Sequence, residues 1–256
     1  MTSNIFSLKD RKVLVTGASS GIGATVARKV SELGGVCAIT GRDKVRLDDT
    51  LQRLSGDGHI TIPGDLESTD FQRDLVKETV RQLGPISGFV HCAGIEKTLP
   101  FRATDDKDLA NVMEINFKSF WILCQEILRK GNHEASRLSV IGISSVAALY
   151  GTAGISAYAS SKGALVSLVR TLAMEYAPKG LRFNCICPGY VDTPMLEKLK
   201  GLYPSEEAFE ETMKRLHPLG IGRPEDVAYA AVFLLGPGAR WITGTIMNVD
   251  GGYSCQ

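Results

Sequence analysis

The sequence contains no long apolar segment and no excess of charge of either sign. Its longest apolar run, around Val227 to Leu235, is far too short to span a bilayer, and the N-terminus lacks the apolar core of a signal peptide. The net charge is +1 and the Lys and Arg residues are dispersed, so neither a nucleic-acid footprint nor a membrane-attracting patch is indicated. We therefore expect a cytoplasmic protein that acts on small molecules, without nucleic-acid or membrane partners.

The sequence also lacks a Cys-x-x-Cys pair and any convincing Cys/His ligand spacing. Cysteines in or beside apolar segments are typical of reduced structural thiols, so we expect no metal site. Cys185 and Cys187 are separated by one residue of an expected strand and should share a face of the sheet. The six cysteines are Cys37, Cys92, Cys124, Cys185, Cys187 and Cys255.

Short apolar runs alternate with longer amphipathic segments along all 256 residues, a pattern typical of βαβ units. A chain of this length, 44% hydrophobic, can bury one full core, so residues 1–256 are expected to form a single domain. The predicted fold is α/β: a doubly wound Rossmann sheet of seven parallel strands with helices on both faces. The expected strands are 13–16, 36–40, 60–63, 88–92, 138–144, 182–187 and 245–249, and the expected helices include 22–33, 71–83, 109–128 and 164–176.

Tyr158 and Lys162 carry the strongest chemical signal. Their i,i+4 spacing at the start of a helical stretch puts both side chains on one face. A free tyrosine has a pKa of about 10, and a nearby cation favours the phenolate, so we expect Lys162 to bring Tyr158 into the range of a general acid or base. Ser145 follows the apolar run 140–143, so its hydroxyl should emerge at the carboxyl end of a strand, where open α/β sheets bind ligands.

Three further motifs accompany this group. Residues 16–23 read Thr-Gly-Ala-Ser-Ser-Gly-Ile-Gly, Asn116 lies in an expected helix, and Pro188-Gly189 follows a later strand. With Ser145, Tyr158 and Lys162, these motifs have the order and approximate spacing of the short-chain dehydrogenase/reductase family. The sequence resembles that family over nearly its whole length, and is closest in pattern to the 3-oxoacyl-acyl-carrier-protein reductase branch.

The resemblance implies hydride transfer between nicotinamide C4 and a carbonyl or secondary alcohol, without a metal. Tyr158 is then the proton donor or acceptor, Ser145 orients the substrate oxygen, and Lys162 holds the cofactor ribose. Asn116 corresponds to a helix asparagine whose backbone distortion holds a water for a proton relay; taken alone it would be an ordinary helix polar residue. A non-catalytic nucleotide-binding regulator is the alternative class, but a binder has no chemical need for all four of these groups.

The expected cofactor site begins at the glycine loop. Gly17 permits a tight turn after a strand, and Gly21 and Gly23 let backbone approach a pyrophosphate at a helix N-terminus. Asp65 fits the family position that touches adenine, although a helix N-cap is an equal interpretation. In full, the expected cofactor contacts are Gly17, Ser19, Ser20, Gly21, Ile22, Gly23, Arg42, Asp65, Leu66, Cys92, Ala93, Gly94, Tyr158, Lys162, Pro188, Gly189, Val191 and Thr193.

Cofactor choice depends on the end of the second expected strand. Gly41 stands where relatives that prefer NAD usually carry an acid, and the guanidinium of Arg42 suits a 2′-phosphate. NADP(H) is therefore favoured over NAD(H). Ser20 argues the other way, because many NADP-preferring relatives have a second basic residue there, and Arg42 could also be a solvated turn charge.

His91-Cys92 is the clear departure from the family pattern, which generally shows Asn-Asn before the Ala-Gly of residues 93–94. A packed, hydrogen-bonded histidine at a strand end and a protonation-sensitive histidine are the two interpretations of His91.

The substrate is less defined by the sequence than the reaction. The branch resemblance suggests 3-oxoacyl thioesters, with Arg129, Lys130 and Lys179 offering charge to an acidic acyl-carrier protein; sugar, steroid or other secondary-alcohol dehydrogenation is the alternative. Residues 193–218, which contain an acidic cluster, are expected to form a mobile substrate lid. The apolar residues of 164–176 exceed what one sheet contact can bury, so we expect self-association. The family resemblance implies that this helix and helix 109–128 pair across a two-fold axis, which makes a homotetramer the expected assembly and a dimer the second choice.

Overall fold

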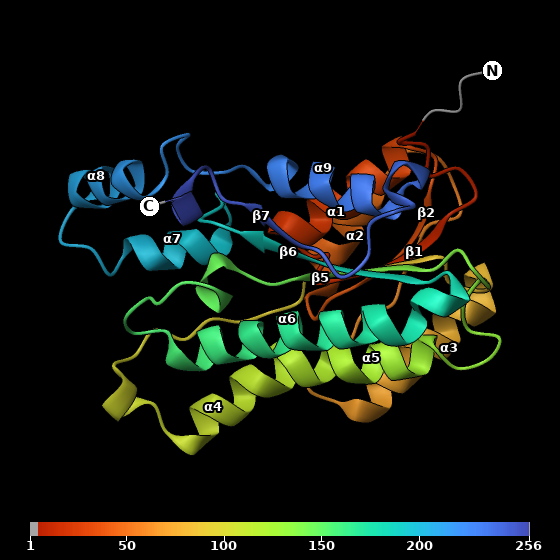
Figure 1. Ribbon diagram of the computed structural model, residues 1–256, viewed down its shortest axis with the longest axis horizontal. Helices are drawn as coiled ribbons and strands as arrows, with labels where there is room; N and C mark the ends of the chain where they lie inside the picture. The colour runs from red at the N-terminus through yellow and green to blue at the C-terminus, as the bar shows by residue number, and fades with distance from the viewer. Residues whose placement is uncertain (1–4, 256) are drawn as a thin grey trace.

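The computed structural model describes residues 5–255, and its centre is a parallel sheet of seven strands in the order β3-β2-β1-β4-β5-β6-β7. This is the predicted doubly wound arrangement (Figure 1). All neighbouring strands pair in parallel, so their carboxyl ends lie at one edge of the sheet. The strands are β1 Lys12–Thr16, β2 Val36–Thr40, β3 Ile60–Thr61, β4 Gly88–His91, β5 Ser139–Ile143, β6 Arg182–Pro188 and β7 Ile246–Val249.

Helices connect the strands. The expected helix 109–128 is divided by a π-helical turn, and the expected helix 164–176 begins eight residues earlier, at Ser156. Short 3₁₀ turns occur at residues 101–103, 146–148, 177–179, 237–239 and 253–255. The helices are α1 Gly21–Glu32, α2 Lys44–Gln52, α3 Thr69–Leu83, α4 Asp106–Met113, the π turn Glu114–Lys118, α5 Ser119–Ile127, α6 Ser156–Tyr176, α7 Pro194–Lys200, α8 Glu206–Leu216 and α9 Pro224–Leu235.

Two apolar cores lie on opposite faces of the sheet. Val13 and Val15 of β1 point into the core beneath α1, α2 and α9, whereas Leu14 points into the core shared with α3, α5 and α6. This alternation follows from the two-residue period of a strand, and burial on both faces explains why the central strands are continuously apolar. Cys185 and Cys187 both lie in the second core, as their spacing predicts.

The strand order brings the carboxyl ends of β1, β4, β5 and β6 together. The loops that follow these four strands therefore meet, although they are distant in sequence. Beyond this edge, α7 and α8 stand apart from the main layers and enclose a small core of their own, formed by Leu196, Phe209 and Met213 (Figure 1). No helix within residues 5–255 combines the length and apolar character needed to cross a membrane.

Candidate active site

Two adjoining cavities open at the carboxyl edge of the sheet. The larger one, of about 830 Å³, runs over the glycine loop, and the smaller one, of about 130 Å³, lies over Ser145 and Tyr158. Residues common to both linings, including Ile22, Cys92 and Gly94, join them. Each of the eighteen residues expected to contact the cofactor lines one or both cavities. Within residues 5–255, no cluster of three or more His, Cys, Asp or Glu side chains is placed to hold a metal ion.

The glycine loop is packed tightly against the rest of the site. Gly17 has a φ of 66°, and a Cβ there would lie 2.7 Å from the backbone nitrogen of Ala93. A Cβ on Gly23 would lie 2.3 Å from the carbonyl oxygen of Gly17, so a glycine is needed here for the packing of α1 against its own loop. The first residues of α1 face the larger cavity, which therefore offers backbone N–H groups to an anion.

Two arginines line the far end of the larger cavity. Arg42, expected from the sequence, is joined there by Arg46, one turn into α2. A second cation was expected only at the position of Ser20, in the glycine loop, but Arg46 comes from α2. Arg46 is near Asp43, with 3.3 Å between its Nε and the carboxylate. The volume and lining of this cavity fit a nicotinamide dinucleotide.

Asp65 lines the same cavity but is not the N-cap of α3, because that position is Ser68, whose side chain accepts from Phe71 N–H at 3.2 Å. Asp65 instead accepts a hydrogen bond from Glu67 N–H at 3.0 Å. Its carboxylate also lies 3.8 Å from the Arg42 guanidinium, and that of Glu67 lies 4.0 Å away. Any phosphate at Arg42 therefore competes with two carboxylates for the same cation.

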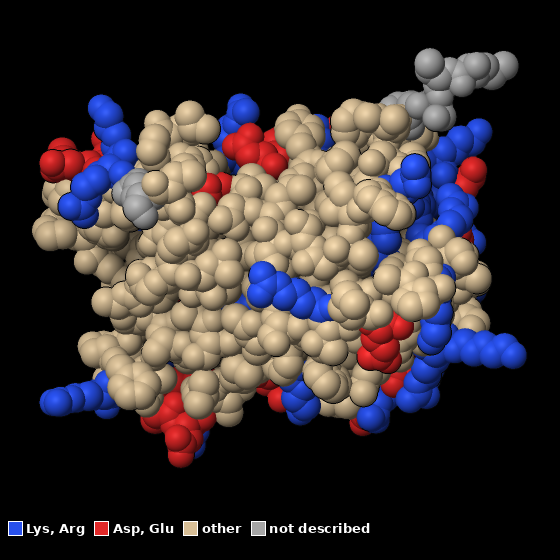
Figure 2. Space-filling view, viewed as in Figure 1, with Lys and Arg blue, Asp and Glu red and all other residues tan. Residues whose placement is uncertain are grey.

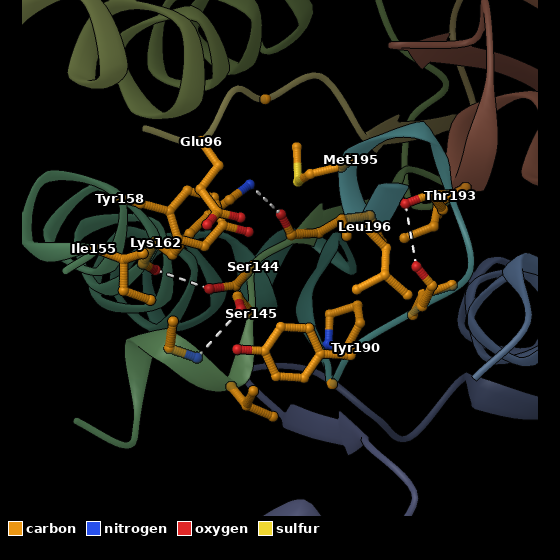
Figure 3. Close-up of a pocket in the computed structure, with 18 of the residues that line it drawn as sticks. Glu96, Ser144, Ser145, Ile155, Tyr158, Lys162, Tyr190, Thr193, Met195 and Leu196 are labelled. Atoms are coloured by element: carbon orange, nitrogen blue, oxygen red, sulfur yellow. Dashed lines mark hydrogen bonds between the residues drawn. The ribbon is translucent and has the colours of Figure 1, made fainter. Parts of the chain in front are cut away.

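Ser145 and Tyr158 meet in the smaller cavity. Ser145 follows β5, as expected, and its hydroxyl accepts from Ala147 N–H at 3.2 Å at the start of a 3₁₀ turn. Tyr158 is the third residue of α6 and is only 8% exposed. Figure 3 shows the two side chains on the same pocket wall, together with Lys162. Ser144 ties the helix to the strand through a 2.9 Å hydrogen bond from its hydroxyl to the Lys162 carbonyl oxygen.

The expectation that Lys162 lowers the pKa of Tyr158 is wrong for this geometry. Burial is the main cause that raises the pKa of Tyr158 above its ordinary value, and the charge of Glu96 raises it further; a hydrogen bond with Ser145 opposes both. The Lys162 ammonium donates to the Ile143 carbonyl oxygen at 2.9 Å and lies 5.6 Å from the centre of the Tyr158 ring. Burial also lowers the pKa of Lys162 to about 8.

Asn116 lies at the centre of the π-helical turn, so the backbone distortion expected at this residue is present. Its side-chain amide clamps the loop after β4: Oδ1 accepts from Ile95 N–H at 2.8 Å, and Nδ2 donates to the Ile95 carbonyl oxygen at 2.9 Å. Nδ2 also donates to the Ser161 hydroxyl at 2.9 Å. Asn116 thus connects the loop, the π turn and α6, and its amide lies at the same edge as Lys162.

Of the two interpretations of His91, the structure supports the packed, hydrogen-bonded histidine. It is fully buried, with Nδ1 2.9 Å from the Thr16 hydroxyl and Nε2 3.3 Å from the Ser119 hydroxyl. Burial lowers the pKa of His91 to about 3, so the ring is neutral at physiological pH. The Thr16 hydroxyl also accepts from Ala93 N–H at 3.3 Å. His91 therefore links the end of β4 to β1 and to the start of α5.

Several pocket residues were not identified from the sequence. Glu96 lines both cavities, and Thr152, Tyr190 and Tyr253 bring hydroxyl groups to the smaller one. Glu96 lies in the loop that follows β4, five residues after His91, so a search of the loops after the strands could have found it. Tyr253 is three residues from the end of the sequence and carries no such signal.

The expected lid contributes to both cavities. Met195 and Leu199 of α7 line both, and Leu196 lines the smaller one. At the end of α8, His217 is buried and its Nε2 accepts from Tyr190 N–H at 3.1 Å. The segment 193–218 therefore contains two helices that lie over the pocket, and His217 links its end to the pocket wall.

Comparison with known proteins agrees with this site. A family model described as enoyl-(acyl carrier protein) reductase matches residues 17–254, and the chain belongs to the short-chain dehydrogenase/reductase family. It is an oxidoreductase that acts on CH–OH or C=O groups with a nicotinamide cofactor.

Individual relatives differ in the substrates that they are named for. The glucose 1-dehydrogenase of Gluconobacter oxydans is 31% identical over 94% of this chain and 91% of its own length. The 3-oxoacyl-acyl-carrier-protein reductase FabG of Thermotoga maritima is 31% identical over 96% of this chain and 98% of its own. Among solved structures, a variant of actinorhodin polyketide ketoreductase with NADPH matches with a TM-score of 0.91 and 29% identity, covering 96% of this chain and 98% of that one.

Proposed function

We propose that this enzyme is an NADP(H)-preferring oxidoreductase that interconverts a carbonyl compound and its secondary alcohol through Ser145, Tyr158, Lys162 and Asn116. One observation carries the proposal: the Ser145 and Tyr158 side chains share the small cavity that opens into the larger, dinucleotide-sized one. When bound, the nicotinamide supplies or accepts the hydride at the substrate carbon.

The residues around that carbon then move the proton. In reduction, Tyr158 gives its phenolic proton to the carbonyl oxygen while Ser145 donates a hydrogen bond that orients the same oxygen. In oxidation, the Tyr158 phenolate takes the proton of the alcohol. Lys162, held over the pocket by Ile143, is placed to hold the cofactor ribose, and the π turn at Asn116 is the proposed site of the relay water.

The preference for NADP(H) is supported by two cations at the adenosine end of the larger cavity. Arg42 and Arg46 both line it, and Gly41 contributes no charge to oppose a phosphate. A Cβ on Gly41 would lie 3.1 Å from the Ser19 hydroxyl, so an acidic side chain there would also be crowded.

A 3-oxoacyl thioester is one proposed substrate, supported by the relatives named as acyl-carrier-protein reductases. The cations expected from the sequence to meet an acidic carrier protein, Arg129, Lys130 and Lys179, give this substrate no further support. Arg129 and Lys179 follow the ends of α5 and α6, at the sheet edge opposite the pocket; α6 alone spans about 27 Å from Tyr158 to Tyr176. Arg129 pairs with Glu126 at 3.0 Å, and the Lys179 ammonium lies 4.6 Å from the Tyr176 ring centre.

A hydroxylated secondary alcohol or sugar is the second proposed substrate. It is supported by the polar groups of the small cavity, Glu96, Thr152, Tyr190 and Tyr253, and by relatives named as glucose and gluconate dehydrogenases.

A panel assay tests the proposed activity. Purified enzyme is incubated with simple ketones, hydroxyketones, sugars and a 3-oxobutanoyl thioester, each with NADPH and NADH or the oxidised forms, and absorbance at the nicotinamide band is followed. We expect turnover of at least one class, faster with the phosphorylated cofactor. Absence of turnover across the panel, while a Tyr158→Phe variant gives the same background, would contradict the proposed function.

We also propose a homotetramer. Trp121 of α5 and Met174 of α6 are 44% and 80% exposed, and Figure 2 shows a largely uncharged surface on the face that carries α6, crossed near its middle by a basic side chain. Burial of such a surface favours association. Light scattering at micromolar concentration should give four times the chain mass of 27.6 kDa. A mass of one chain would be the contrary result, and Met174→Lys should lower the measured mass.

We also propose a moving lid and a cytoplasmic location. Residues 193–218 move as a lid when substrate binds, since they cover the pocket and have their own small core. The enzyme acts in the cytoplasm, where its six free cysteines would stay reduced.

A further inference from the structure

Glu96 is an acidic group in an otherwise mostly uncharged substrate pocket. It extends from the loop after β4 and lines the small cavity together with Tyr158, Thr152 and Tyr253. Figure 3 shows its side chain in the same pocket as Tyr158, whose pKa its charge raises. The pKa of Glu96 is raised by burial, which indicates that the carboxylate is poorly solvated.

The protein itself gives this carboxylate little compensation. Its hydrogen bond comes from the Thr98 hydroxyl at 3.1 Å. Neither the neighbouring Lys97 nor Lys162 of the same cavity is recorded as its partner: Lys97 pairs with Asp108, and Lys162 donates to the Ile143 carbonyl oxygen. A carboxylate has up to four acceptor positions, so Glu96 can accept hydrogen bonds from a ligand in addition to the one from Thr98.

The position of Glu96 is fixed independently of its side chain. Both backbone polar groups of the preceding residue, Ile95, are hydrogen-bonded to the Asn116 amide, at 2.8 and 2.9 Å. The loop therefore presents residue 96 at a defined place next to Tyr158, which is the requirement for selective recognition of a substrate group near the reacting carbon.

We propose that Glu96 is a specificity-determining residue that accepts a hydrogen bond from a hydroxyl of the substrate near the reacting carbon, so that the enzyme acts on hydroxylated secondary alcohols and their ketones. This inference rests on the proposed function and chooses between its two substrate classes. Thr152, Tyr190 and Tyr253 supply further hydroxyls to the same cavity, which suits a polyhydroxylated molecule. The chain of a simple acyl thioester would leave the Glu96 carboxylate unpaired, and an anionic substituent would be repelled.

A matched pair of ketones tests the proposal. 2-Hydroxycyclohexanone and cyclohexanone differ by the hydroxyl next to the carbonyl, and D-glucose and 2-deoxy-D-glucose form the equivalent sugar pair for oxidation. We expect wild-type kcat/KM to favour the hydroxylated member by about ten- to a hundredfold, the worth of one charge-assisted hydrogen bond. Glu96→Gln should lose most of the kcat/KM preference for the hydroxylated compound, and Glu96→Leu should lose all of it. Glu134→Gln, which alters an ion pair with Arg137, serves as the matched control and should keep it.

The pH profile of the reaction is a second measurement, and it would not change if Glu96 had only a structural role. Since its charge raises the pKa of Tyr158, Glu96→Gln should shift the pH profile of cyclohexanol oxidation toward lower pH, while the melting temperature and NADPH affinity stay near those of the wild type. A wild-type ratio near one, a ratio unchanged in Glu96→Gln, or a 3-oxobutanoyl thioester reduced more than tenfold faster than the hydroxyketone would each overturn the inference. Lack of turnover on every compound would instead refute the proposed function, and the inference with it.

Discussion

Replacing Tyr158 with phenylalanine should lower kcat by about a hundred- to ten-thousandfold, the usual contribution of a positioned general acid or base. The change removes one hydroxyl from a ring that is packed in α6, so folding and cofactor affinity should stay close to the wild type. Steady-state kinetics on any active substrate, with NADPH binding followed by fluorescence titration, measure both effects. Lys162→Ala should differ by weakening cofactor binding as well.

The matched control is Tyr229→Phe, because Tyr229 is a half-exposed tyrosine on α9, away from both cavities. It should retain full activity. Near-normal turnover by Tyr158→Phe would show that another group transfers the proton. The direction of the Tyr158 pKa shift adds a pH dependence: the phenol is protonated at neutral pH and ready for reduction, whereas oxidation needs the phenolate and should accelerate as pH rises.

The second large effect concerns cofactor choice. Arg42→Ala should weaken NADPH binding by about ten- to a hundredfold and barely change NADH binding, since charge-assisted hydrogen bonds to a phosphate contribute about 1.5 to 3 kcal/mol. The loss of NADPH affinity should be nearer tenfold than a hundredfold, because the carboxylates of Asp65 and Glu67 lie 3.8 and 4.0 Å from the Arg42 guanidinium and compete with the phosphate for it. Arg46→Ala should cause a smaller loss in the same direction.

Calorimetric titration of both cofactors into the wild type and the two variants measures this preference. Arg53→Ala provides a control, because Arg53 follows α2, pairs with Asp49 and lies outside the lining of the cavity. Added salt should reduce the difference in affinity between NADPH and NADH, because the phosphate site at Arg42 is exposed and is screened by salt. Equal losses for NADPH and NADH in Arg42→Ala, or tighter NADH binding by the wild type, would refute the assignment.

The sheet could be predicted from sequence because each central strand is buried on both faces. Such strands appear as short continuous apolar runs, and their parallel pairing with helical crossovers leaves few possible orders. The same topology rule explains why Ser145 could be located: it follows an apolar strand, so it had to lie at the carboxyl edge. Glycine-loop residues were recognisable because their local backbone requires glycine at particular points, as at Gly17.

Orientation of side chains could not be predicted in the same way. Tyr158 and Lys162 share a face of α6. Whether the Lys162 ammonium points to the phenol, however, depends on the Ile143 carbonyl oxygen, which belongs to strand β5. Arg46 enters the cofactor cavity because of how α2 packs on the sheet, and Tyr253 reaches the pocket through the path of the last residues. These are tertiary facts, and local spacing carries no information about them.

The clamp of Asn116 on Ile95 has a consequence for how such an enzyme can change over time. The loop after β4 is held through main-chain atoms, so the identity of the side chain at residue 96 is not needed to keep the loop in place. A mutation there alters what the pocket accepts without altering the position of the proton donor beside it. The fold thus separates the part of the site that performs the reaction from a neighbouring position that is free to vary, and new substrate preferences can arise at residue 96 by single replacements.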